Sequence, residues 1–379
     1  MGKFGKKVEI NLNPLAYNIG LLGESGIGKS TIIKQTCEKL VGPNGYISLD
    51  IGREDGHKAI SGIVSERVEN WAKFEEIVDD IVENKFEDYP DLKVVVIDTY
   101  DQLCDIAEKE TIRIWNQKCR AAQKPTVDTI NGAFGGFGKG LDKTIDLILD
   151  KLWALKSVGV SFIIIAHTKR TDITDIMSEE QYTMLTASTT QRYFNAIKQK
   201  LDFLGMAYID RDLVRVKTNK KDKDGKAIEK NKVSGESRVI NFRDDTYSVD
   251  SKCRFANIVD QIPFDADAFI KAMQDAILAE QSNDGISVEA AKTKQAKEEK
   301  KEIENAKEVS ANAKKKKEDD ALEASRGDIL EAIQKNFMSA TNEQKTEIKK
   351  MLTEEKFSKM SDPQIPVEFL NKVAKLLNC

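Results

Sequence analysis

Histidine is scarce in this 379-residue chain, which has two, and its five cysteines include no Cys-x-x-Cys pair. Because structural zinc sites draw four Cys or His ligands from such short spacings, these counts argue against a zinc site. No apolar run approaches the roughly 20 residues of a membrane-spanning helix, and residues 1–7 do not resemble a signal peptide. We therefore expect a soluble, cytoplasmic protein with reduced thiols and no membrane contact.

An excess of positive charge is missing as well. Lysine and arginine number 59 against 63 aspartates and glutamates, so the formal net charge is −4. This balance excludes a basic coat for nucleic acid over the whole surface, and any such surface must be local. The length fits one large domain with a smaller one, or two domains.

Strand-like and helix-like segments alternate over residues 1–280, which predicts an α/β fold with a mostly parallel sheet and crossover helices. The expected strands are 17–22, 46–50, 94–98, 161–167 and 203–209. The expected helices are 29–40, 65–84, 101–121 and 141–158. Between residues 205 and 255 the pattern changes to antiparallel β-ribbons, and a helix over 264–280 closes this core.

The remainder of the chain has a different composition. Residues 281–320 form a charged, lysine-rich linker, with ten lysines and five acids between Lys292 and Lys317. This linker cannot bury a core, so it is either a solvated helix or disordered, and contact with DNA is an alternative role. Residues 321–379 regain helical periodicity and predict a small helical module, which could dock a protein partner.

A phosphate-binding loop is predicted by LLGESGIGKST (residues 21–31), which fits GxxxxGK[ST] between a strand and a helix. Backbone N–H groups must wrap the phosphates closely, which glycines permit. Lys29 is expected to reach the β- and γ-phosphates of ATP, and Ser30 to coordinate Mg²⁺. The expected nucleotide-binding residues are Gly23, Glu24, Ser25, Gly26, Ile27, Gly28, Lys29, Ser30 and Thr31.

An acid for the magnesium shell follows the apolar run in LKVVVIDTY (residues 92–100). A buried central strand reads as such a run, and ligand-binding groups emerge at its carboxyl end. Asp98 stands at that end. An Asp after a strand is often a helix cap, but after a phosphate loop it fits the metal-binding acid.

The segments YISLD (46–50), VVVIDT (94–99) and IIIAHTK (163–169) resemble strand ends of the RecA-type ATPase core, over roughly residues 15–275. That group includes recombinases, DnaB-type helicases, RadA and KaiC. More closely, the chain looks like phage-encoded RecA-like ATPases, some of which act in single-strand annealing. The additional cues are FGGFGKG (134–140) and the late Lys-x-Arg-Phe at 252–255.

The resemblance implies catalytic roles. Asp50 would polarise the attacking water, although many relatives carry Glu there, and Glu54 is the alternative. A third interpretation is an acid that only caps a helix. His167 would sense the γ-phosphate, against a purely structural role. The other histidine, His57, is interpreted as a surface residue.

The resemblance also implies that Lys252 and Arg254 reach the nucleotide of an adjacent subunit, as a finger pair that neutralises transition-state charge. The plain alternative is two solvated cations on a ribbon. The finger interpretation requires self-assembly into a ring or a filament.

DNA is the expected partner, single-stranded by preference, because residues 121–140 and 168–200 correspond to DNA-binding loops of RecA-type proteins. Phe134 and Phe137 suit a loop that orders on a ligand. Tyr193 and Phe194 could stack on bases, but their helical spacing favours core packing. The candidate phosphate contacts are Lys169, Arg170, Arg192, Lys198 and Lys200.

The sequence thus predicts an oligomeric ATPase that acts on DNA in phage-type recombination or replication, in the host cell cytoplasm. One alternative is an ATPase that loads a helicase or another protein through residues 321–379. The other alternative is an ATP-dependent assembly switch with little turnover, which the shortened acid at Asp50 makes credible.

Overall fold

The computed structural model describes residues 10–52, 56–174, 180–221, 227–243, 249–283, 288–355, 357, 359–360, 362 and 365–377. The chain divides into two compact units, Met1–Lys307 and Glu308–Cys379. Each unit has its own hydrophobic core. In the described part of the chain, no helix is both long and apolar enough to span a membrane.

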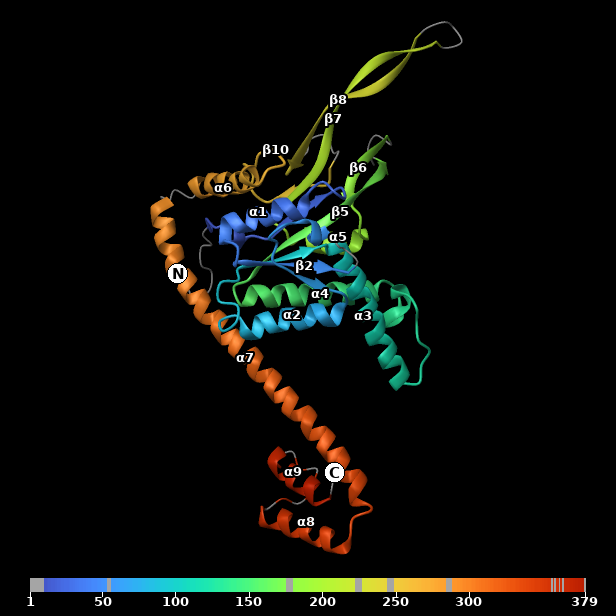
Figure 1. Cartoon of the computed structure of the whole chain (residues 1–379), viewed down its shortest axis with the longest axis vertical. Coiled ribbons are helices and arrows are strands. Elements are labelled where there is room, and N and C mark those ends of the chain that lie inside the picture. The colour runs from blue at the N-terminus through green and yellow to red at the C-terminus, as the bar shows by residue number, and fades with distance from the viewer. Residues whose placement is uncertain are drawn as a thin grey trace. The chain divides into compact units, whose positions relative to one another are not determined.

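A ten-stranded mixed sheet forms the centre of the first unit (Figure 1). Across the sheet the strands follow the order β10 (Gln261–Pro263), β8 (Ala227–Asn241), β7 (Phe203–Lys221), β1 (Ile19–Gly23), β5 (Ser161–Thr174), β4 (Val94–Asp98), β2 (Tyr46–Ile51) and β3 (Ser65–Val68). Two further strands, β6 (Gln181–Ala187) and β9 (Lys252–Cys253), pair with β5 and β7. From β3 to the start of β7 the strands run parallel, and β8 pairs antiparallel with both of its neighbours, β7 and β10. The predicted α/β fold with a mostly parallel sheet is confirmed.

Helices cover both faces of the sheet (Figure 1). One face carries α1 (Lys29–Val41) and α6 (Ala266–Asn283), which pack on each other. The other face carries α2 (Trp71–Asn84), α3 (Tyr100–Ala121) and α4 (Lys139–Ser157). The remaining short elements of this unit are η1 (Pro14–Ala16), η2 (Gly56–Ala59), η3 (Ile130–Gly135) and α5 (Gln191–Lys198).

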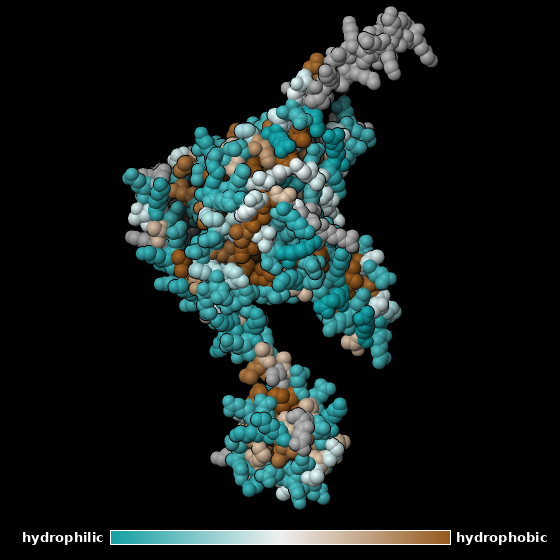
Figure 2. All heavy atoms as spheres, viewed as in Figure 1, coloured by the Kyte–Doolittle hydropathy of each residue, from teal (hydrophilic) through white to brown (hydrophobic). Residues whose placement is uncertain are grey.

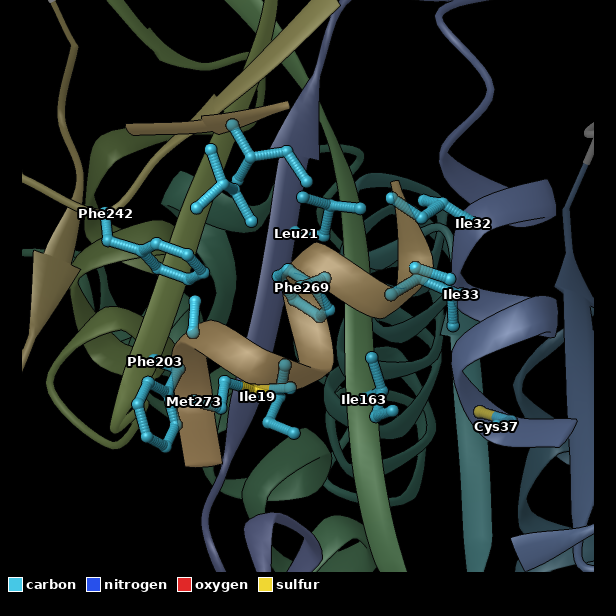
Figure 3. Packing of buried hydrophobic residues seen from close by; sticks show 14 of the residues in the cluster. Ile19, Leu21, Ile32, Ile33, Cys37, Ile163, Phe203, Phe242, Phe269 and Met273 are labelled. Carbon is cyan, nitrogen blue, oxygen red and sulfur yellow. The ribbon is translucent and has the colours of Figure 1, made fainter. Parts of the chain in front are cut away.

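The core under α1 and α6 explains the apolar runs of the central strands (Figure 3). Alternate residues of a strand face opposite sides of a sheet. Because helices bury both sides here, the central strands are apolar at successive positions and do not alternate between apolar and polar residues. Ile19, Leu21 and Ile163 meet Phe269 and Met273 of α6 on this face, all fully buried. Each such side chain contributes about 1.5–3 kcal/mol through burial.

Two strands continue beyond the parallel sheet as antiparallel hairpins. From Thr168 to Thr174, β5 pairs with β6 instead of with parallel neighbours. β7 pairs with β1 only up to Ala207, and beyond that point it continues as a two-stranded ribbon with β8 (Figure 1). The antiparallel ribbon predicted after residue 205 is confirmed.

The helix expected over 65–84 is wrong at its start. Residues Ser65–Val68 form β3, which pairs with β2, and α2 begins at Trp71. Asn70 caps that helix by accepting a hydrogen bond from the N–H of Lys73 at 3.0 Å. Helical periodicity cannot reveal a strand partner that lies 17 residues earlier, in the register Ser48 to Ser65.

The second unit is helical. α7 (Val288–Phe337) begins in the first unit and continues into the second, and it includes much of the lysine-rich segment, for which the sequence left helix and disorder open. α8 (Asn342–Glu354) starts with a capping box between Thr341 and Gln344, and α9 (Val367–Leu376) follows. Ile333, Ile348 and Leu370 form the centre of a small core between these helices.

Candidate functional site

The predicted phosphate loop joins β1, which ends at Gly23, to α1, which begins at Lys29. A Cβ at Gly23 would lie 2.8 Å from the carbonyl oxygen of Ala207, so only glycine fits there. Gly28 has φ of 107°, a left-handed conformation that also favours glycine. The first N–H groups of α1 lack intrahelical acceptors, and together with the helix dipole they form an anion-binding end.

Lysine, serine and aspartate side chains meet at this loop. Nζ of Lys29 is buried and donates to the carbonyl oxygens of Gly23 and Glu24, each at 3.0 Å. Ser30 donates its hydroxyl to Oδ2 of Asp98 at 2.5 Å. A hydroxyl and a carboxylate in contact at the carboxyl ends of the strands fit the oxygen-ligand preference of Mg²⁺. No cluster of three or more His, Cys, Asp or Glu suited to a metal occurs in the described residues, so phosphate oxygens and water would complete the shell.

The other predicted loop residues lie in the turn between β1 and α1, except for Thr31, which lies in the first turn of α1. Ser25 and Thr31 are exposed, and Ile27 is buried. The guanidinium of Arg238, from β8, donates to the carbonyl oxygen of Ile27 at 3.2 Å. Because β8 also forms the ribbon with β7, this contact joins the phosphate loop to the root of the ribbon.

His57 is buried beside Asp98, the acid expected to bind the metal, and its interpretation as a surface residue is wrong. Its Nε2 lies 2.9 Å from Oδ2 of Asp98 and 3.5 Å from Oγ of Ser48. The imidazole side chain is only 6% exposed. Oδ2 of Asp98 therefore has two partners, Ser30 and His57, whereas Oδ1 has no hydrogen-bond partner among the described residues. His57 is buried because η2, which follows β2, returns the chain to the edge of the sheet where the parallel strands have their carboxyl ends. No local sequence pattern indicates this burial.

The expected catalytic base, Asp50, lies at the same edge of the sheet. It is the register partner of Asp98 on the adjacent strand, and it is buried. Its Oδ2 lies 3.5 Å from Nη1 of Arg67 on β3, so the carboxylate is engaged in an ion pair. The alternative base, Glu54, lies outside the described residues.

His167 is placed where β5 leaves its parallel neighbours, opposite Gly23 in the register with β1. Its backbone N–H and Nδ1 approach Oδ2 of Asp101 at 2.8 and 3.2 Å, and Ser188 donates to Oδ1 at 2.8 Å. Burial acts to raise the pKa of Asp101, but the hydrogen bonds from His167 and Ser188 outweigh it, and the pKa is lowered. Asp101 thus anchors the strand end that carries His167.

Sequence comparison identifies the family. A family model of the AAA domain matches residues 15–255, which include the phosphate loop, Asp98 and His167. The chain belongs to the AAA domain family. A search of curated proteins found no match. Among solved structures, a prototypical ATPase from the type III secretion system of pathogenic bacteria matches at 15% identity with a TM-score of 0.27, over 50% of each chain. This AAA-domain chain thus spans half the length of that ATPase.

The expected finger residues of this AAA domain lie at the other edge of the sheet from the phosphate loop. Cys253 of β9 pairs with Phe203, the first residue of β7. Gly23, at the start of the phosphate loop, pairs with Ala207, which lies four residues further along β7. That offset is about 13 Å at 3.3 Å per residue. Lys252 and Arg254 therefore lie at the opposite end of β7 from the residues that pair with the phosphate loop.

Within the subunit, both cations cap the end of α5. Lys252 donates to the carbonyl oxygens of Lys198 and Gln199 at 2.8 and 3.2 Å. Arg254 donates to the carbonyl of Gln199 at 2.7 Å and pairs with Asp202 at 3.2 Å. Partial burial, and next the charge of Arg254, lower the pKa of Lys252. A helix C-terminus leaves carbonyl oxygens without intrahelical N–H donors, so these contacts also stabilise the AAA domain locally.

The two segments expected to contact DNA are structured differently. Residues 168–200 form the β5–β6 hairpin and α5, with 175–179 outside the described residues. Tyr193 and Phe194 are 2% and 1% exposed, so core packing is confirmed for both. In the other segment, Phe134 packs on Trp115 with ring centroids 4.9 Å apart, whereas Phe137 is 98% exposed.

The basic residues of the first segment have mixed surroundings. Arg192 pairs with Asp142, Lys198 with Asp250, and Lys169 donates to the carbonyl of Ser188. Arg170 and Lys200 are exposed.

Proposed function

We propose that this chain is an ATP-binding and ATP-hydrolysing, oligomeric RecA-like ATPase that acts on DNA, with single-stranded DNA preferred, in phage-type recombination or replication. The observation that supports ATP use most directly is the contact of Ser30 with Asp98 beside a phosphate loop. AAA-domain membership implies nucleotide binding and, typically, a divalent metal. Mg²⁺ bound to Ser30, with Asp98 in its shell, would neutralise charge on the β- and γ-phosphates.

The chain's own residues would then act as follows. Lys29 exchanges its two carbonyl partners for phosphate oxygens. Asp50, whose Oδ2 lies 3.5 Å from Nη1 of Arg67, accepts a proton from the attacking water. Glu54 remains the alternative base. His167, held by Asp101, senses the γ-phosphate.

Lys252 and Arg254 would complete the site of the adjacent subunit. Their position at the edge away from their own phosphate loop supports action in trans. The contacts that they make with the end of α5 would be exchanged for phosphate oxygens when a neighbour docks. Hydrolysis then depends on self-assembly, in a ring or a filament.

Local basic charge supports DNA as the partner. The strand segments 211–221 and 227–233 of the β7–β8 ribbon contain seven lysines and arginines and two acids, although the whole chain has a net charge of −4. The exposed ring of Phe137 offers a stacking surface for an unpaired base. The helical module over residues 321–379 is proposed as the docking site for a protein partner.

The test is steady-state ATP hydrolysis at several protein concentrations, with and without single-stranded DNA. We expect DNA to raise the rate and the specific activity to rise with protein concentration. Arg254→Ala should remove both effects. Arg113→Ala is the matched control, because Arg113 is similarly exposed and pairs with Glu110 on its own helix, α3. A rate that ignores both DNA and concentration would refute the proposal.

One observation favours a second candidate. The ion pair between Asp50 and Arg67 occupies the expected base, which suits a switch that assembles with ATP and turns over slowly. The ATPase rate of an Arg67→Gln variant distinguishes the slow switch from the hydrolytic ATPase. A large rise in turnover would show that the ion pair restrains hydrolysis, as a switch requires, whereas an unchanged or lower rate would favour the hydrolytic ATPase.

A further inference from the structure

His57 contacts Asp98, and the proposed ATPase mechanism assigns no role to this contact. Its Nε2 and the Ser30 hydroxyl converge on one oxygen, Oδ2 of Asp98, at 2.9 and 2.5 Å. Both partners of this histidine contact are nearly inaccessible, with side chains 6% and 7% exposed. A hydrogen bond to a carboxylate is strong in such a setting, because little water competes for either group.

We propose that His57 is a positioning residue that orients the Asp98 carboxylate for the divalent metal. This inference rests on the proposed ATPase function and adds to it a residue from outside the nucleotide-binding motifs. Two donors on Oδ2 prevent rotation of the carboxylate about its Cβ–Cγ bond, because rotation would break both hydrogen bonds. Oδ1, which has no hydrogen-bond partner among the described residues, is then left available to the metal shell.

The geometry assigns the proton as well. A carboxylate only accepts hydrogen bonds, so the donor in this contact is Nε2–H of the imidazole. A side chain that places an N–H at the same position should therefore replace His57. Glutamine can place its amide nitrogen where Nε2 lies, whereas the shorter asparagine side chain reproduces the position of Nδ1 instead.

The test measures the affinity of the full chain for a fluorescent ATP analogue, once in EDTA and once across a Mg²⁺ titration, in wild type, His57→Ala, His57→Gln and His57→Asn. We expect His57→Ala to raise the Mg²⁺ concentration at half-saturation about 10-fold or more, as loss of an outer partner of a metal ligand does. Nucleotide affinity in EDTA should be unchanged. His57→Gln should restore most of the Mg²⁺ response, and His57→Asn should not.

Two comparisons separate positioning from general damage. Thr111→Val removes a buried hydroxyl that bonds the carbonyl of Ala107 and contacts Thr144, away from the phosphate loop. It should lower stability and leave the Mg²⁺ response unchanged. Asp98→Asn should abolish the Mg²⁺ response and sets the maximum effect.

If His57→Ala weakens nucleotide binding equally in EDTA, or if Gln is no better than Asn, His57 only anchors the turn after β2 and the assignment is overturned. If wild type itself gains no affinity from Mg²⁺, the proposed ATPase function fails. A wild type that responds normally, with an unchanged His57→Ala, overturns the role of His57 alone.

Discussion

The carboxylate of Asp101 holds His167 by two contacts to one oxygen: the backbone N–H at 2.8 Å and Nδ1 at 3.2 Å. Asp101 lies in the first turn of α3, and His167 lies where β5 leaves the parallel sheet. The two histidines of the chain thus each contact an aspartate of the segment 98–101. This short segment joins the acid expected to bind the metal to the residue expected to sense the γ-phosphate.

Asp101 should stabilise the first unit in a pH-dependent manner. Its pKa is lowered, because hydrogen bonds from His167 and Ser188 outweigh the opposing effect of burial. Its contribution is therefore present above the ordinary pKa of 3.8 and is lost as the pH falls through the lower folded value. At pH 7, Asp101→Asn should reduce the free energy of unfolding by about 2 kcal/mol.

Urea unfolding followed by tryptophan fluorescence measures this effect, because Trp71, Trp115 and Trp153 all lie in the first unit. The difference between wild type and Asp101→Asn should shrink below about pH 4. A difference that stays constant down to pH 3 would contradict the assigned charge dependence.

Two inactive variants should restore each other if the finger acts in trans. Lys29→Ala lacks the lysine proposed to bind phosphate but keeps Arg254, and Arg254→Ala has the reverse defect. Random pairing of equal amounts in a head-to-tail assembly makes about a quarter of the interfaces intact. We expect about that share of wild-type ATPase activity in the mixture.

The same mixture distinguishes catalysis from capping of α5. If Arg254 only stabilises the carbonyl of Gln199, mixing restores nothing, and Arg254→Ala instead lowers the urea midpoint. The mixture must be compared with each variant alone at the same total concentration.

Substitution of the two phenylalanines in the loop before α4 should have different effects, one on DNA binding and the other on stability. Phe137 is exposed, so Phe137→Ala should weaken single-stranded DNA binding about 5- to 100-fold, with stability within about 0.5 kcal/mol of wild type. Phe134 packs on Trp115, so Phe134→Ala should cost about 1–3 kcal/mol of stability. Fluorescence anisotropy with a labelled oligonucleotide measures the first effect. Equal DNA affinity of Phe137→Ala and wild type would remove this ring from the interface.

The packing of α6 on the sheet can be tested at Phe269. This ring is fully buried and stacks on Phe242, with centroids 5.7 Å apart. Phe269→Ala should lower the free energy of unfolding by about 3–5 kcal/mol. Val259→Ala, at a side chain 47% exposed, is the control and should change stability by no more than about 0.5 kcal/mol. A loss below about 1 kcal/mol at Phe269 would argue against this packing.

Much of the fold could be predicted because its signals are local. The apolar runs of β4 and of the first half of β5 have no polar residue to face water, so they predict strands that are buried on both faces of a sheet. The start of α2 could not be placed, because β3 exists only through pairing with β2. Likewise, residues 168–174 extend β5 only because β6 returns beside them.

The sequence by itself determined the phosphate loop and Asp98, since a glycine pattern and an acid after a buried strand carry their meaning within about ten residues. Only the tertiary structure decided the partners of those groups. The burial of His57 against Asp98, the ion pair of Asp50 with Arg67, and the position of Arg254 at the far edge each depend on which strands are neighbours. Strand order comes from burial of the whole sheet, a long-range balance of free energy that no short segment of the chain encodes.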